Sequence, residues 1–120
     1  MRLAKSLAAA LLLTAGPALA GQDYACAHWQ PAGQTPDLSA VSVLKSTLVV
    51  TTGAAPETIR MMQGTLTRRV YPDETGLYVL HGDMVRTDNG PGFGPSITVQ
   101  RLVHDPDHPT LLLTTCEASR

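Results

Sequence analysis

Residues 110–116 read Thr-Leu-Leu-Leu-Thr-Thr-Cys, a run without charge, glycine or proline. Leucine and β-branched threonine together favour an extended, well-packed strand. An exposed edge on such a strand would promote aggregation, so we expect both of its edges to be paired or covered. The run ends at Cys116, and the only other cysteine is Cys26, near the opposite end of the sequence. The sequence therefore predicts a Cys26–Cys116 disulfide that joins the last strand to the first.

The first 20 residues have the pattern of a secretory signal peptide. Two basic residues precede the apolar core Leu7–Gly16, and Ala18-Leu19-Ala20 matches the small-x-small cleavage pattern. The alternative is a membrane anchor, but this apolar run is too short to span a bilayer. We therefore expect cleavage near Ala20, a periplasmic or secreted location, and a single domain over residues 21–120.

Export would place both cysteines in an oxidising compartment, where two cysteines usually pair. The closed loop would span 90 residues, for which a chain-entropy treatment gives about 4–5 kcal/mol of stabilisation. The alternative is a redox-active pair, but the cysteines are far apart and form no Cys-x-x-Cys motif. A structural disulfide is the better interpretation.

Charge narrows the classes of partner. Without its first 20 residues the chain has seven basic and ten acidic side chains, a net charge of −3 with histidine neutral. No basic stripe is present, so we expect neither nucleic acid nor an anionic membrane surface as a partner. No second apolar run is long enough to span a membrane. A protein of the cell envelope is the partner that these features leave open.

Alternating and β-branched residues predict strands along most of the chain. The first strand is expected within Gln22–Gln30, and a second one covers Leu38–Thr52. The pattern of Glu57–Gln63 fits either a helix or a strand. A helix there would begin after Pro56 but would have only about two turns, which is marginal without tertiary support. A strand fits its surroundings better, and we favour it.

The clearest hairpin joins Thr65–Tyr71 to Leu77–His81 through the turn Pro72–Gly76. Glycine inside a strand often marks a bulge, so we expect one at Gly82-Asp83. Asp88–Pro95 follows and is rich in glycine and proline. We expect no regular structure there.

Ser96–Val103 and the run ending at Cys116 complete a set of six or seven strands. The sequence thus predicts an all-β fold, a small antiparallel meander closed or nearly closed into a barrel, with a β-sandwich as the alternative. Only five residues are aromatic, so the core should consist mainly of Leu, Val, Ile and Met. A narrow barrel is filled by its own side chains, so we expect no wide ligand cavity.

A candidate metal site lies in the last turn, where two imidazoles and two carboxylates fall within five residues. Their side chains suit zinc or another divalent ion, the only cofactor that the sequence suggests. These residues are His104, Asp105, Asp107 and His108. The alternative is ordinary turn chemistry, because proline presets a turn and aspartate caps neighbouring backbone amides.

A candidate partner-binding site is the loop tip with the only phenylalanine, Phe93, between Gly92 and Gly94. A large apolar side chain on a loop can anchor a protein contact. The alternative is that Phe93 folds back as a lid over one end of the core.

Arg68 and Arg69 are adjacent in a predicted strand, so their side chains should point to opposite faces. We expect one to face solvent. The other could lie at the sheet rim or pair with an acid such as Asp73 or Asp83.

The sequence shows no catalytic motif. No serine of the mature chain lies in a Gly-x-Ser-x-Gly elbow, no phosphate-binding loop is present, and both cysteines are assigned to the disulfide. A non-catalytic protein is therefore expected, with a hydrolase whose site is not recognised as the alternative.

The triplets Tyr24-Ala25-Cys26 and Thr114-Thr115-Cys116 lie at the two ends of the expected domain. In this respect the chain resembles the bacterial c-type lysozyme inhibitors of the periplasm. The resemblance implies a small β-barrel and, as one possible activity, lysozyme inhibition. The serine- and glycine-rich central motif of those inhibitors has no counterpart here, where residues 73–78 read as a turn.

Three functions follow from the sequence. The first is a secreted or periplasmic binding protein that contacts another protein through surface loops. The second is a small-ligand or divalent-metal module that uses the His104–His108 turn. The third is a protein similar to the lysozyme inhibitors.

Overall fold

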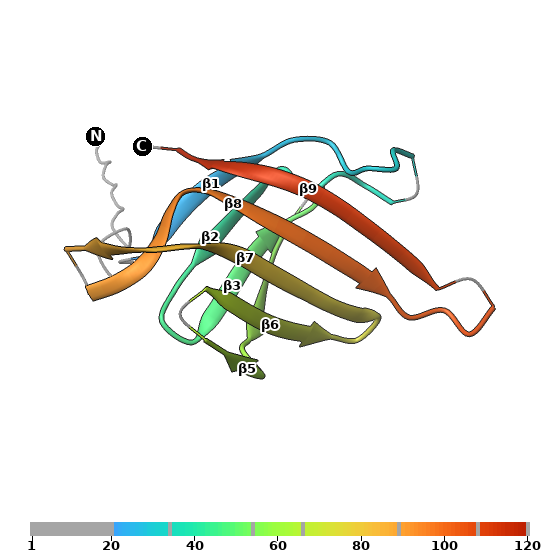
Figure 1. Cartoon of the computed structure of the whole chain (residues 1–120). Helices are drawn as coiled ribbons and strands as arrows, with labels where there is room; N and C mark the ends of the chain where they lie inside the picture. Colours follow the sequence, from blue (N-terminus) through green and yellow to red (C-terminus); the bar gives the residue numbers. More distant parts are fainter. Residues whose placement is uncertain are drawn as a thin grey trace, which may run out of the picture.

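The computed structural model describes residues 21–33, 35–53, 55–65, 67–88, 90–107 and 109–119, and these contain nine strands. The predicted signal peptide lies outside the described residues. Figure 1 shows the strands as one continuous sheet. Their bounds are β1 Gln22–Cys26, β2 Ala40–Val43, β3 Thr47–Thr51, β4 Pro56–Arg60, β5 Gln63–Gly64, β6 Arg68–Asp73, β7 Gly76–Thr87, β8 Gly90–Val103 and β9 Thr110–Ala118.

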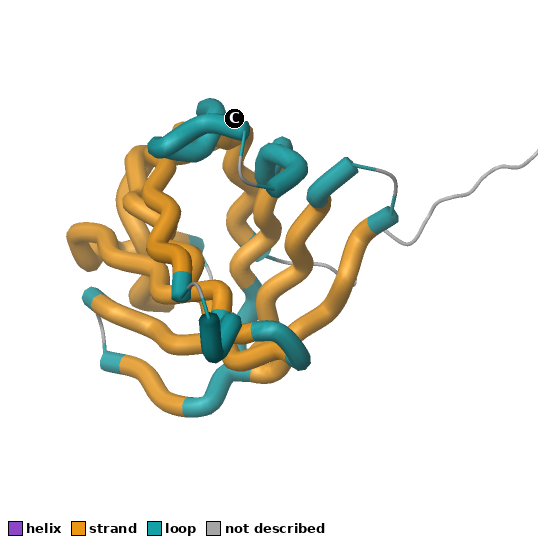
Figure 2. Tube along the Cα trace, turned by 90° about the vertical axis from the view of Figure 1, so that its right-hand side faces the viewer, coloured by secondary structure: helices purple, strands orange, loops and turns teal. Residues whose placement is uncertain are grey.

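The sheet is antiparallel throughout and has the order β4-β3-β2-β1-β9-β8-β7-β6-β5. It curls around a common interior as a half-barrel (Figure 2). The two outermost strands, β4 and β5, are consecutive in the chain. Between them the amide of Met61 donates to the Ser46 carbonyl and that of Met62 donates to the Val70 carbonyl. The chain therefore bends from pairing with β3 to pairing with β6, while β4 and β5 remain the two edges of the sheet.

The predicted disulfide is confirmed. Cys26 of β1 lies opposite Cys116 of β9 in the sheet, and the two are bonded with their Cα atoms 4.0 Å apart. The bridge thus joins the half of the sheet that ends in β4 to the half that ends in β5. A disulfide in this position suits an oxidising, extracytoplasmic compartment.

The prediction of six or seven strands was wrong in two places. Leu38–Thr52 is a hairpin of β2 and β3, which turns where the Leu44 amide donates to the Thr47 carbonyl. This turn contains neither glycine nor proline, so no local residue signalled it. Glu57–Gln63 is extended rather than helical, as favoured, but it is divided between β4 and β5.

The prediction that Asp88–Pro95 lacks regular structure was also wrong. Strand β8 begins at Gly90, which has a φ of 100°, and continues to Val103. Its first part pairs with the end of β7, whereas β9 pairs with β8 only from Ser96 onward. Prolines are tolerated in that first part because one of its edges carries no partner strand. The expected bulge is confirmed by a register shift between Gly82 and Met84.

The β6–β7 hairpin is confirmed, with Asp73 opposite Gly76 and two residues between them. Glycine is required at position 76, because a Cβ atom there would lie 1.8 Å from the Leu102 carbonyl oxygen. The amide of His104 in turn donates to the Thr75 carbonyl. The turn is therefore fixed against the end of β8.

The interior is filled at its middle, as a narrow barrel should be. Aliphatic side chains form most of the core, but methionine contributes only Met61 at its edge, and all five aromatic residues are buried. The core residues are Tyr24, Trp29, Leu38, Val41, Val43, Leu48, Val50, Ile59, Tyr71, Tyr78, Leu80, Phe93, Ile97, Val99, Leu112 and Cys116. Space remains at the two ends of the barrel, where inward-facing residues are polar or charged.

Candidate functional site

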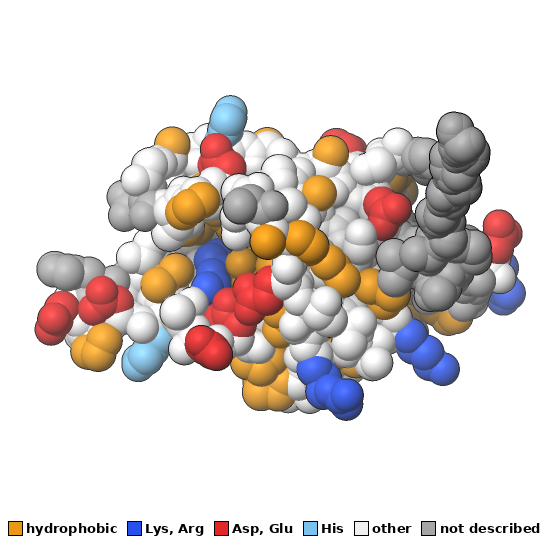
Figure 3. Space-filling view, turned by 180° about the vertical axis from the view of Figure 1, so that it is seen from behind, with side chains coloured by type: hydrophobic (Ala, Val, Ile, Leu, Met, Phe, Trp, Pro, Cys, Tyr) orange, Lys and Arg blue, Asp and Glu red, His pale blue; other side chains and the backbone are white. Residues whose placement is uncertain are grey.

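A cavity of about 390 Å³ lies at the end of the half-barrel formed by the β6–β7 turn, the start of β4 and the loop before β2. In the space-filling view from behind, acidic and basic side chains meet in a hollow near the middle of the face (Figure 3). The cavity is lined by Trp29, Thr35, Pro36, Thr52, Glu57, Asp73, Glu74, Thr75, Tyr78, Arg101 and Val103.

Arg101 is the centre of this site. It faces inward from β8 because Ile97 and Val99, four and two residues earlier, face the core on the same side. Its Nη1 donates to Oδ1 of Asp73 at 3.0 Å, and its Nη2 donates to the Thr75 hydroxyl at 2.6 Å. The side chains of this ion pair are only 10% and 8% exposed. A buried guanidinium is thus matched by a carboxylate and a hydroxyl from one turn.

Asp73 remains ionised. Burial raises the pKa of its carboxyl, but the hydrogen bond and charge of Arg101 lower it by more, with help from the amides of Thr75 and Gly76. The resulting pKa lies below the ordinary value of 3.8. An Asp73 in this state is a fixed charge rather than a proton donor at neutral pH.

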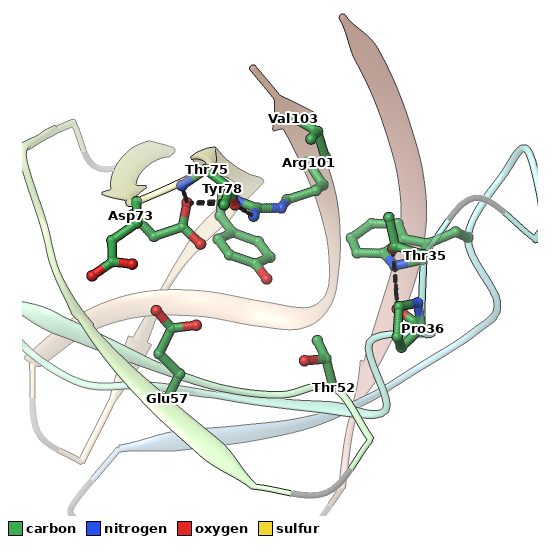
Figure 4. Close-up of a pocket in the computed structure, with 11 residues that line it drawn as sticks. Thr35, Pro36, Thr52, Glu57, Asp73, Thr75, Tyr78, Arg101 and Val103 are labelled. Atoms are coloured by element: carbon green, nitrogen blue, oxygen red, sulfur yellow. Dashed lines mark hydrogen bonds and ion pairs between the residues drawn. The ribbon is translucent and has the colours of Figure 1, made fainter. Parts of the chain in front are cut away.

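The ring of Tyr78 lies under Arg101, with 4.3 Å between the guanidinium carbon and the ring centroid. Its hydroxyl points into the cavity (Figure 4). Burial raises the pKa of that hydroxyl, Arg101 opposes the rise, and the charges of Asp73 and Glu57 add to it. Tyr78 is therefore neutral at physiological pH and offers a hydrogen-bonding oxygen.

Glu57 faces Asp73 and Tyr78 from the other side of the cavity (Figure 4). It is exposed on β4, and within the described residues its carboxylate forms no hydrogen bond or ion pair. Glu74 is exposed on the β6–β7 turn. Three carboxylates against one guanidinium leave the cavity with two negative charges.

Trp29 forms an aromatic wall held by the loop that follows β1. Its indole Nε1 donates to the Pro36 carbonyl at 3.1 Å, and its amide donates to Oδ1 of Asp37 at 3.1 Å. His28 contacts the other oxygen of Asp37 at 2.6 Å. These hydrogen bonds, that of His28 first, lower the pKa of Asp37. Pro36 and Asp37, in the loop before β2, therefore hold Trp29 in place as a wall of the cavity.

The structure corrects the predicted role of Phe93. Its side chain is 0% exposed and belongs to the core, and Gly92 and Gly94 are buried as well. This burial fits the alternative in which Phe93 folds back over one end of the core. Because Phe93 belongs to strand β8 and its side chain is buried in the core, it is not available as a protein contact.

The predicted metal-binding turn is not assembled in the part of the chain that is described. His104, Asp105 and Asp107 are exposed there, and the Asp107 amide donates to Oδ1 of Asp105, as in an ordinary aspartate turn. His108 lies outside the described residues. Among those described, no three metal-ligating side chains gather. Metal binding by the full set stays a prediction.

The two adjacent arginines do point to opposite faces. Arg68 is exposed, whereas Arg69 is half-buried and lies over the Phe93 ring. Neither acid suggested as a partner pairs with it, because Asp73 binds Arg101 and Asp83 forms no ion pair.

Sequence reasoning missed Arg101, Tyr78 and Glu57. Arg101 could have been found, because the inward alternation of Ile97 and Val99 continues to it. The place of Glu57 depends on the curl of the sheet, which brings β4 against β6. No local pattern encodes that contact.

Comparison with known protein families, curated proteins and solved structures finds no match for this chain. The described residues include no helix long and apolar enough to cross a membrane.

Proposed function

We propose that this protein is a non-catalytic binding protein that takes a basic side chain, a lysine or arginine of a partner polypeptide, into the acidic cavity. One observation carries the proposal: of the described residues, the cavity holds Glu57, Asp73 and Glu74 but only one cation, Arg101. Arg101 is already matched by Asp73. The remaining carboxylates therefore favour a cation supplied from outside.

The walls of the cavity suit such a cation. Charges that are partly shielded from water attract each other more strongly than charges on an open surface. Trp29 adds an aromatic surface, and cations are attracted to ring faces. The Tyr78 hydroxyl can accept a hydrogen bond from an ammonium or guanidinium group.

A binding role suits the cavity better than catalysis. Among the described residues, its lining includes no histidine, serine, cysteine or lysine. Asp73 is held as a carboxylate by Arg101, which removes it as a general acid. Partner recognition by charge at one end of the barrel replaces the Phe93 contact expected from the sequence.

Titration calorimetry with acetyl-Gly-Lys-Gly-amide tests the proposal, with the norleucine peptide as a neutral control. We expect saturable binding of the lysine peptide in roughly the millimolar range, about −4 kcal/mol. Glu57→Gln should weaken it about three- to tenfold, as expected for loss of one charged contact.

Asp83→Asn is the matched control, because Asp83 is an exposed carboxylate outside this cavity. It should leave the affinity unchanged. Equal binding of the norleucine peptide, or equal weakening by Asp83→Asn and Glu57→Gln, would contradict the proposal.

A second candidate is inhibition of a c-type lysozyme. It rests on the two terminal triplets and on the observed bridge between β1 and β9, which suits the architecture implied by that resemblance. Lysis of bacterial cells by lysozyme should slow when the protein is added in slight molar excess. Unchanged lysis at large excess would remove this candidate and leave the first one standing.

A further inference from the structure

A second cavity, of about 590 Å³, lies at the opposite end of the half-barrel from the acidic one. Asp73 and Arg69 both face inward from β6, four residues apart, and line different cavities. The second cavity has Lys45 from the β2–β3 turn and Arg69 as its cations, and Asp88 as its only acid. It therefore carries a net charge of +1.

The side chain of Arg69 lies over the ring of Phe93, which is itself held in place. Its guanidinium carbon lies 4.9 Å from the centroid of the Phe93 ring. The side chain of Gln22 fixes Phe93: its Nε2 donates to the Phe93 carbonyl at 2.6 Å, and its Oε1 accepts from the Phe93 amide at 3.0 Å. Gln22 thus positions the ring that supports Arg69.

Arg69 has no carboxylate partner. All ten acidic residues of the sequence are described, and the two ion pairs among the described residues involve only Asp37 and Asp73. Lys45 has no carboxylate partner either. Arg101, which also lies over an aromatic ring at the other end, has one. A half-buried guanidinium without a counter-charge is costly unless a ligand supplies that charge.

A second polar group lies next to Arg69. The Tyr71 hydroxyl is fully buried, and no hydrogen bond of good geometry satisfies it. Burial raises the pKa of this hydroxyl, whereas a side-chain contact with Arg69 and the charge of Arg69 lower it. Tyr24, the other buried tyrosine near Arg69, donates instead to the Gly94 carbonyl at 2.8 Å. This end of the barrel therefore combines a cation that has no carboxylate partner with a buried hydroxyl beside it.

We propose that the second cavity binds an oxyanion, a phosphate or carboxylate group, held by Arg69 and Lys45. A guanidinium offers two parallel N–H donors that match the oxygens of either group. Lys45 adds a second positive charge from an exposed turn. The site is separate from the acidic cavity and does not depend on the function proposed for it.

Calorimetric titrations with sodium phosphate and with sodium acetate, at constant ionic strength set by sodium chloride, test this site. Saturable binding of phosphate alone identifies a phosphate site, and binding of acetate alone identifies a carboxylate site. If neither phosphate nor acetate binds at concentrations up to about 50 mM, well above the dissociation constant of a roughly millimolar site, the proposal is overturned.

Arg69→Gln should weaken the binding at least about fivefold, the scale of a lost charge-assisted contact. Arg68→Gln is the matched control, because it removes the same charge from the adjacent residue on the opposite, exposed face. An equal effect of both variants would show only nonspecific attraction and overturn the proposal.

Lys45→Gln keeps the test valid if Arg69→Gln fails to fold, because Lys45 is exposed on a turn. It should also weaken binding, and Asp88→Asn should strengthen it by removing the one nearby negative charge. Unchanged affinity in Lys45→Gln, with its thermal unfolding unaltered, would count against the site.

Discussion

At the scale of single residues, two inward-facing arginines differ in whether a carboxylate neutralises them. Arg101 lies over Tyr78 and is neutralised by Asp73, whereas Arg69 lies over Phe93 without an acid. The first arrangement fixes the shape of the acidic cavity. The second leaves a charge free for a ligand. The two ends of one barrel therefore attract groups of opposite sign.

Asp73→Asn should lower the free energy of unfolding at neutral pH by about 3–5 kcal/mol, because it leaves the buried Arg101 charge uncompensated. Because the folded-state pKa of Asp73 lies below 3.8, its stabilisation is complete above that value and is lost as the pH falls below it. Urea denaturation should thus show a large difference from the natural protein at about pH 7, and this difference should shrink progressively as the pH falls below 3.8. A constant difference across this range would refute the assignment of the pKa shift to Asp73.

Two buried tyrosines should respond differently to loss of the hydroxyl. Tyr24→Phe removes a hydrogen bond and leaves the Gly94 carbonyl unsatisfied, so it should destabilise the fold by about 1–2 kcal/mol. Tyr71→Phe removes a buried hydroxyl that has no well-formed hydrogen bond, only a contact with Arg69, and should cost less than Tyr24→Phe in phosphate-free buffer. Chemical denaturation of both variants measures their free energies of unfolding and tests this difference. Equal losses would mean that the Tyr71 hydroxyl has a partner after all.

At the scale of elements, the β6–β7 hairpin organises the acidic cavity. It supplies Asp73, Thr75 and Tyr78 within six residues, and its turn is bonded to the end of β8. The sequence predicted this hairpin because proline, aspartate and glycine mark its turn. The β2–β3 turn carries no such residue and was missed. The start of β8 was missed for the opposite reason, since its glycines and prolines mimic a loop.

Gly76→Ala tests how tightly the hairpin turn is packed. A methyl group would meet the Leu102 carbonyl oxygen at 1.8 Å, so the backbone must move, at a cost of about 1–3 kcal/mol or more. The new side chain should also weaken binding at the acidic cavity by displacing Asp73. Gly94→Ala is the control, because its nearest contact would be an ordinary 3.5 Å. A Gly76→Ala protein as stable as the control would contradict the observed register.

At the scale of the whole molecule, one disulfide joins the two halves of an incompletely closed sheet. The sequence predicted this bridge and the all-β class, because cysteine count and strand patterns are local signals. It did not predict the half-barrel, because closure depends on how strands far apart in the chain meet. For the same reason it missed Glu57, which reaches the cavity only through the contact of β4 with β6.

Replacing both cysteines, Cys26→Ser with Cys116→Ser, should lower the free energy of unfolding by about 4–5 kcal/mol through the entropy of a loop of this length. That is a large part of the roughly 5–15 kcal/mol that stabilises a small domain. Thermal unfolding of the double variant and of the reduced natural protein should agree. An unchanged melting temperature would mean that strand pairing alone holds the halves together.

The most direct test of the acidic cavity uses Trp29, the only tryptophan of the chain, which lines it. Nuclear magnetic resonance can follow its single indole N–H signal while acetyl-Gly-Lys-Gly-amide is added. We predict a saturable shift of that signal with the lysine peptide, none with the norleucine peptide, and a reduced response in Glu57→Gln. An indole signal that stays fixed while amides elsewhere on the surface respond to the lysine peptide would contradict a cation-binding cavity.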